Sequence, residues 1–239
     1  MSEIQIVRAD ERFHTDIGWL DSWHSFSFSN HYDPKNTHHG LLRVHNDDVV
    51  AAGAGFTPHS HRDMEIVTWV LEGALEHRDS EGNHGVIRPG LAQRMSAGRG
   101  ITHSEMNASA DEPVHLLQMW VVPDVSGITP EYEEVDVTDR LTTGVLVPLA
   151  SGREPDAAIR IHQRDATLWV ARVVPDATVT VPGAPYVHVF VARGTADLDG
   201  AGTLVKGDAV RLTEAGPRAL IAGPAGAEVT VWESHAALV

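Results

Sequence analysis

The sequence predicts an all-β protein made of two β-barrels in tandem, and three features lead to this prediction. Short stretches rich in β-branched and aromatic residues recur between Gly, Pro and Asp turns, which is typical of sandwiches and barrels. Helical periodicity is scarce. Turn-rich breaks lie at Pro123–Tyr132 and Leu149–Asp156, so we expect the chain to divide between 123 and 156. The predicted domains are residues 1–133 and residues 134–239.

Ten stretches are predicted to be strands on this pattern: Leu41–Val44, Glu65–Leu71, Leu75–Arg78, Gly85–Ile87, Val114–Val122, Ala166–Val174, Thr178–Val181, Val187–Val191, Ala209–Leu212 and Ala227–Trp232. The acidic run Glu131–Asp136 is interpreted as a solvated face or connector. The second half follows the strand order of the first, with an expected turn at Arg193-Gly194 placed like the turn at Glu72-Gly73.

Composition excludes several classes of protein. The chain of 239 residues has no cysteine, so it has neither a disulfide framework nor a thiolate metal site. Its 18 Lys and Arg residues are scattered and the net charge is −15, which argues against direct binding to nucleic acid. No basic, apolar leader and no apolar run of about 18 residues is present, so we expect no membrane contact and a cytoplasmic location.

Two pairs of metal-competent side chains, His59 with His61 and His103 with Glu105, are each separated by one residue. Alternate side chains of a strand share a face, so each pair is expected to point to one side of a sheet. The 15 histidines make about one chance His-x-His pair expected, but here Gly- and Pro-rich turns flank both pairs. Three imidazoles and a carboxylate suit iron, nickel, copper, manganese or zinc. The pattern predicts a metal site inside a barrel.

The segments around these pairs carry a family resemblance. Pro58–Gly73 (PHSHRDMEIVTWVLEG) and Met95–Asn107 (MSAGRGITHSEMN) resemble the two cupin motifs of the pirin family, and more closely those of its bacterial quercetinase-type members. Trp23–Pro34 and Gly40–Asp48 resemble the family's opening. The resemblance is strong over about the first 125 residues and looser beyond. It implies a bicupin, two jelly-roll barrels of which the second has lost its ligands.

The carboxylate ligand has two candidates on sequence grounds. Glu65 lies four residues after His61, so an unbroken strand would present it on the same face as the histidines. Parity does not choose between Glu65 and Glu105. The resemblance does: His59, His61, His103 and Glu105 match the pirin ligands, which leaves Glu65 to orient a ligand imidazole.

The resemblance also implies an activity. Bacterial relatives of this type open flavonols such as quercetin with dioxygen and release carbon monoxide, so the expected substrates are a flavonol-like small molecule and O2. One divalent transition metal per chain is expected, with Fe(II) preferred over Ni, Co, Cu, Mn or Zn. Glu105 is expected to serve as both ligand and catalytic base. The alternative is a non-enzymatic, metal-containing regulator that binds a protein partner; another cupin reaction, such as sugar isomerisation, is a third class.

Other histidines and aromatic residues are expected to have structural roles. His188, alone on an apolar strand, is expected to be a core or edge residue and not a ligand. An N-terminal cluster could line a pocket mouth for a flat substrate, but a structural cap on the barrel is preferred. Its members are Trp23, His24, Phe26, Phe28, His31 and Tyr32.

Overall fold

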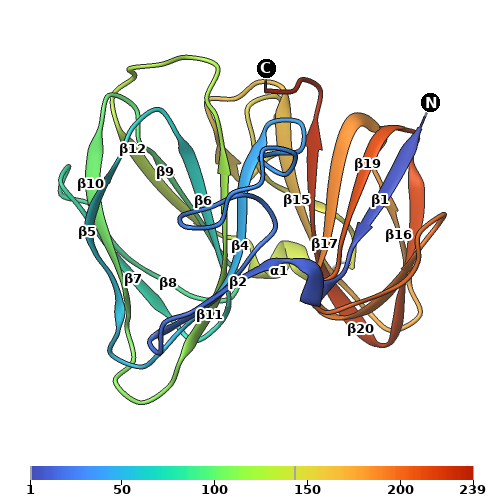
Figure 1. Ribbon diagram of the computed structural model, residues 1–239, viewed down its shortest axis with the longest axis horizontal. Helices are drawn as coiled ribbons and strands as arrows, with labels where there is room; N and C mark the ends of the chain where they lie inside the picture. Colours follow the sequence, from blue (N-terminus) through green and yellow to red (C-terminus); the bar gives the residue numbers. More distant parts are fainter. Residues whose placement is uncertain (1, 143, 239) are drawn as a thin grey trace.

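The computed structural model describes residues 2–142 and 144–238 and shows two β-barrels side by side (Figure 1). The all-β prediction is confirmed, because the described residues contain only one short α-helix, α1 (Thr138–Leu141), and one 3-10 turn, η1 (Ala9–Glu11). Each of the ten predicted stretches overlaps an observed strand. Within the described ranges, no helix is long and apolar enough to span a membrane.

Two sheets form the first barrel. The larger has the order β12-β9-β6-β11-β4-β3-β2, and the smaller has the order β5-β10-β7-β8. Their bounds are β2 (Phe13–Asp16), β3 (Leu20–His24), β4 (Leu42–Val50), β5 (Gly55–His61), β6 (Glu65–Glu72), β7 (Leu75–Asp79), β8 (His84–Ile87), β9 (Leu91–Ser96), β10 (Ile101–Asn107), β11 (Val114–Val121) and β12 (Glu131–Asp136). The smaller sheet lies on the side away from the second barrel (Figure 1).

A nine-stranded sheet forms the second barrel, with the main path β1-β19-β17-β20-β15-β13-β14. Its strands are β1 (Glu3–Val7), β13 (Val147–Ser151), β14 (Ile159–Arg160), β15 (Ala166–Val173), β16 (Thr178–Val181), β17 (Ala184–Leu198), β18 (Gly202–Val205), β19 (Ala209–Ala215) and β20 (Arg218–Ser234). The interior is packed with small and branched apolar side chains, including Val189, Leu212 and Val231.

A shared apolar core joins the barrels. Trp69 and Met119 of the first barrel cluster with Phe190 and Trp232 of the second, and all four are buried. The Trp69 indole also donates a 2.8 Å hydrogen bond to a carboxylate oxygen of Glu228 across this seam. Continuous burial of large side chains makes the two barrels one packed unit.

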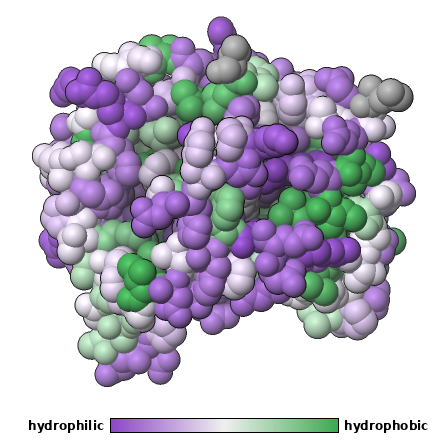
Figure 2. All heavy atoms as spheres, in the orientation of Figure 1, coloured by the Kyte–Doolittle hydropathy of each residue, from purple (hydrophilic) through white to green (hydrophobic). Residues whose placement is uncertain are grey.

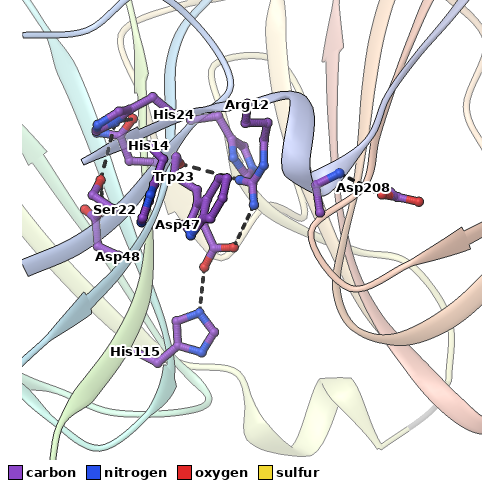
Figure 3. A network of polar contacts seen from close by, with 12 residues as sticks. Arg12, His14, Ser22, Trp23, His24, Asp47, Asp48, His115 and Asp208 are labelled. Atoms are coloured by element: carbon purple, nitrogen blue, oxygen red, sulfur yellow. Dashed lines mark hydrogen bonds and ion pairs between the residues drawn. The ribbon is translucent and has the colours of Figure 1, made fainter. Parts of the chain in front are cut away.

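The N-terminal segment crosses between the barrels. β1 pairs with β19 of the second barrel, whereas β2 pairs with β3 of the first. Beside η1, Arg12 forms a 3.2 Å ion pair with Asp47, whose other oxygen lies 2.6 Å from the Nε2 of His115 (Figure 3). Asp208 of the second barrel accepts a hydrogen bond from the backbone of the same segment. β1 was expected in the first domain because it lies within residues 1–133, but it belongs to the sheet of the second barrel.

Two further expectations are corrected. Glu131–Asp136 is not a connector but strand β12, which pairs with β9 in regular antiparallel register; none of its residues is buried, so the expected solvated face is confirmed. Arg193-Gly194 is not a turn: β17 runs through it with register shifts, and Gly194 takes a positive φ of 70°. A bulge of this kind bends a strand without ending it, and a local sequence pattern does not distinguish the two.

Polar residues dominate the surface in the view of Figure 2, where hydrophobic residues gather only in separated patches. This agrees with the net charge of −15.

Candidate metal centre

The predicted ligands lie on two neighbouring strands of the small sheet. In the β5–β10 ladder His59 is opposite His103, and His61 is opposite Ile101. The register shifts between His103 and Glu105, where β5 contains one extra residue, so that Glu105 is opposite Phe56. The two pairs predicted from spacing alone are therefore brought side by side.

The three histidines converge. One ring nitrogen from each of His59, His61 and His103 lies within 4.8 Å of the others, and the ring centroids are 4.5–4.9 Å apart. The Nε2 atom of His103 is buried and has no hydrogen-bond partner in the described residues. A buried ring nitrogen without a hydrogen-bond partner is costly unless a ligand binds it, and a divalent metal fits this donor set.

The turn before β10 depends on a glycine. Gly98 has a φ of +46°, and a Cβ at this position would overlap the carbonyl oxygen of Ile128. The neighbouring Arg99 amide donates a 2.7 Å hydrogen bond to the same carbonyl. This close approach fixes where β10 begins, and so where His103 points.

Ring nitrogens must be neutral to bind a metal, and the surroundings favour that state. Burial, followed by the neighbouring His103 and His59, lowers the pKa of His61 to about 4, although Glu105 opposes the change. Burial, followed by His59 and His77, lowers the pKa of His103 to about 3. Both rings are therefore neutral at pH 7.

Glu105 is held from the opposite sheet. The side-chain amide of Gln118 on β11 donates a 2.7 Å hydrogen bond to Oε2 of Glu105. The amide is itself oriented by Trp120, whose indole N–H donates a 3.2 Å hydrogen bond to its oxygen. The Trp120 ring also packs against His61, with centroids 4.9 Å apart. The two sheets thus meet at the candidate site.

A fifth metal-competent side chain, His77 on β7, lies at the site and was missed by the sequence analysis. It is opposite Glu105 in the β7–β10 ladder, so both point to the same face. His77, His103 and Glu105 form a second group of donors within 4.8 Å of one another, all buried. The only sequence signal was its position within a predicted strand, which does not reveal the neighbouring strand.

Glu65 does not join the cluster. Its Oε2 atom accepts hydrogen bonds from the Ser96 hydroxyl at 2.8 Å and from the backbone amide of His162 at 3.1 Å. It lies on β6, in the other sheet, and none of its described hydrogen bonds reaches a ligand imidazole. Because Asp63, with a φ of 47°, breaks the strand between His61 and Glu65, parity does not carry across this turn.

The remaining candidates lie elsewhere. His188 is buried at the seam, against Phe26 and His45. Of the N-terminal aromatics, Phe28 comes near the cluster, with its ring 5.5 Å from that of Trp120 in a T-shaped contact.

The open side of the cluster faces strand β5. His59 and His61 are half-buried, whereas His103 and Glu105 are buried. A pocket of about 390 Å³ beside β5 is lined by Trp19, Gly55, Phe56, Thr57 and His59. A small molecule would therefore approach the imidazoles from this edge of the sheet.

The chain is similar in sequence and in structure to several known proteins. The model of the Pirin family matches residues 6–121. The Mycobacterium tuberculosis protein Rv0181c, whose name assigns quercetin 2,3-dioxygenase activity provisionally, is 57% identical over 236 residues, covering 98% of this chain and 96% of that protein. Quercetin 2,3-dioxygenase of Escherichia coli K12 is 42% identical over 198 residues, covering 82% and 84%. The crystal structure of the Escherichia coli bacterial pirin YhhW in complex with nickel(II) has a TM-score of 0.89 and 36% identity, and covers 99% of this chain and 100% of that one. The chain thus belongs to the pirin family.

Proposed function

We propose that this protein is a metal-dependent dioxygenase that opens a flavonol-type enol substrate with O2 and releases carbon monoxide. The observation that carries the proposal is the convergence of the His59, His61 and His103 imidazoles at the half-buried edge of a barrel, with Glu105 grouped with the same His103. Relatives named for quercetin 2,3-dioxygenase activity, at 42–57% identity, support an oxidoreductase of this class.

The proposed ligands are His59, His61, His103 and Glu105. A divalent ion held by them would supply Lewis acidity to the enol oxygen of the substrate and a common place for substrate and dioxygen. Four protein ligands leave room for both in a five- or six-coordinate site. Fe(II) remains the expected ion, while the YhhW structure contains nickel(II).

Glu105 has a second proposed role, as the base that accepts the substrate hydroxyl proton. Its Oε2 atom accepts a hydrogen bond from Gln118, and one of its carboxylate oxygens lies within 4.8 Å of a ring nitrogen of His103. A carboxylate fixed in this way is oriented to accept a proton. The aromatic walls of the pocket, Trp19 and Phe56, suit a flat substrate.

The test combines metal analysis with turnover. The protein is purified without oxygen, reconstituted with iron(II), nickel(II), cobalt(II), copper(II) or manganese(II), and assayed for quercetin loss, O2 uptake and carbon monoxide release. We expect one metal per chain and coupled turnover. His61→Ala is expected to lose both, and Glu105→Gln to keep part of the metal but lose most turnover. His84→Ala, on the surface of the same barrel, is the control.

Two results would contradict the proposal. Wild-type turnover by metal-loaded Glu105→Gln would remove Glu105 as the base. One bound metal without turnover under any reconstitution would remove the dioxygenase. No observation in the structure favours the regulator that binds a protein partner, so it is not developed further.

A further inference from the structure

His77 and Asp79 form a chain of contacts that ends on a proposed ligand. The Nε2 atom of His77 lies 3.1 Å from Oδ2 of Asp79, and its Nδ1 atom lies 3.4 Å from Nδ1 of His103. Both side chains of this pair on β7 are fully buried. Tyr132 stacks on the His77 ring, with centroids 4.8 Å apart, and so holds its plane.

Asp79 can only accept hydrogen bonds in this arrangement. Its Oδ1 atom accepts from the backbone amides of Glu81 and Asn83, both at 3.0 Å, and the Asn83 side chain donates to Oδ2 at 2.9 Å. A carboxylate surrounded by donors is an ionised acceptor, so the Nε2 atom of His77 must carry a hydrogen.

The positions of the other hydrogens follow in sequence. In the imidazole form with its one hydrogen on Nε2, His77 presents the lone pair of Nδ1, and in that arrangement the hydrogen between the two Nδ1 atoms belongs to His103. The Nε2 atom of His103 is then unprotonated. This is the buried atom that has no partner among the described residues.

We propose that Asp79 and His77 are positioning residues, which act as a relay that fixes His103 in the tautomer with Nε2 free for the metal. His59 is fixed differently, because its Nδ1–H donates a 2.8 Å hydrogen bond to the backbone carbonyl of Thr57. Outer partners of this kind orient ligand imidazoles and raise their basicity, and their loss weakens metal binding. Because the relay ends on the Asp79 carboxylate, the His103 ring is more strongly polarised than the His59 ring, which donates only to a backbone carbonyl.

The same geometry argues against His77 as a ligand. Both of its nitrogens are engaged, one by Asp79 and one by His103. If its Nδ1 atom bound the metal, His103 would lose its hydrogen-bond acceptor within a buried site. The relay leaves neither ring with an unsatisfied atom once a metal is bound.

Asp79→Asn is the decisive variant. The backbone amides of Glu81 and Asn83 require an acceptor at the Oδ1 position, so the new amide nitrogen is expected to face His77. The relay would then reverse, with the hydrogen of His103 moved to Nε2, where it blocks the metal. His77→Phe keeps the stack on Tyr132 but removes the acceptor. Glu76→Gln is the matched control, because this carboxylate pairs with His84 on the same hairpin at the surface.

The tautomer of His103 is read in the metal-free protein by long-range 1H–15N correlation of labelled histidines, and nickel(II) affinity is then measured by chelator competition. We expect Nδ1–H in the wild type and in Glu76→Gln, Nε2–H in Asp79→Asn, and a mixture in His77→Phe. Affinity should fall roughly 10- to 100-fold in the two site variants. An Nε2–H His103 in the wild type would overturn the relay, as would wild-type tautomer and affinity in Asp79→Asn.

A direct ligand role for His77 is tested in the zinc-loaded protein, where a metal-induced 15N shift at its Nδ1 would also overturn the relay. The inference rests on the metal-site part of the proposed function. Because the tautomer is read before metal or substrate is added, an inactive but nickel-binding protein would refute the dioxygenase and leave the relay standing.

Discussion

Gln118→Leu is expected to slow turnover while leaving the fold intact. The change keeps a side chain of similar size but removes the amide that donates to Oε2 of Glu105 over 2.7 Å. Both side chains are buried, at 7% and 2% exposure, so water does not readily replace the lost donor. The carboxylate would then be free to rotate away from the substrate.

The magnitude follows from the kind of hydrogen bond removed. A hydrogen bond to a charged group contributes about 1.5–3 kcal/mol. If this energy holds Glu105 in the reactive orientation, kcat falls roughly 10- to 150-fold, since about 1.4 kcal/mol corresponds to a factor of ten. The Michaelis constant should change little, because Gln118 is proposed to act on Glu105 and not on the substrate.

The assay compares kcat for quercetin in preparations of equal metal content. Gln93→Leu is the matched control, because Gln93 is a buried glutamine of the same barrel with no described contact to the cluster. Gln118→Asn tests whether a shorter donor restores part of the rate. A metal-loaded Gln118→Leu variant within twofold of the wild-type kcat would refute the reasoning.

Three further predictions concern stability. Trp69→Phe removes the donor to Glu228 across the seam and should lower the free energy of unfolding by about 1–3 kcal/mol in urea titration; a loss below about 0.5 kcal/mol would show that the bond is not needed. Burial, and to a lesser degree nearby carboxylates, raises the pKa of Asp48 to about 7 from 3.8. Between these pH values the native metal-free state binds more protons than the unfolded state. The free energy of unfolding should therefore fall as pH rises from 4 to 7, by on the order of 4 kcal/mol. Asp48→Asn should abolish this fall, and an unchanged pH profile would assign it to another group. Gly127→Ala should lower the free energy of unfolding by about 1–3 kcal/mol, because Gly127 has a positive φ but open space around it. Gly98→Ala should lower it further, because the new Cβ would also clash with the backbone at Ile128. Equal melting temperatures of the two variants would contradict the proposed clash.

The positions of most strands could be predicted because their signal is local. Alternating apolar residues between turns mark β6, β11 and β15 without knowledge of their partners. The pairing of β1 could not be predicted in this way, because its partner β19 lies about 200 residues further along the chain and no local pattern indicates which strand it pairs with. The bulge in β17 was mistaken for a turn because both place glycine at a positive φ.

The candidate site likewise has one part that the sequence could predict and one part that it could not. The spacing of His59 with His61 and of His103 with Glu105 indicates which side chains share a face. Spacing does not indicate which strands are neighbours, and this is why His77 was missed. Its place opposite Glu105 is a property of the β7–β10 ladder alone.

The crossing of the N-terminal segment between barrels has a consequence for synthesis. β1 leaves the ribosome about 200 residues before its partner β19, which begins only at Ala209. At 5–20 residues per second, β1 waits roughly 10–40 s for this partner. The first barrel can assemble during that time, while the sheet of the second stays one edge strand short. The pairing of β1 with β19 therefore has to wait until β19 has been made, and a chaperone or a competing strand has that interval in which to bind β1.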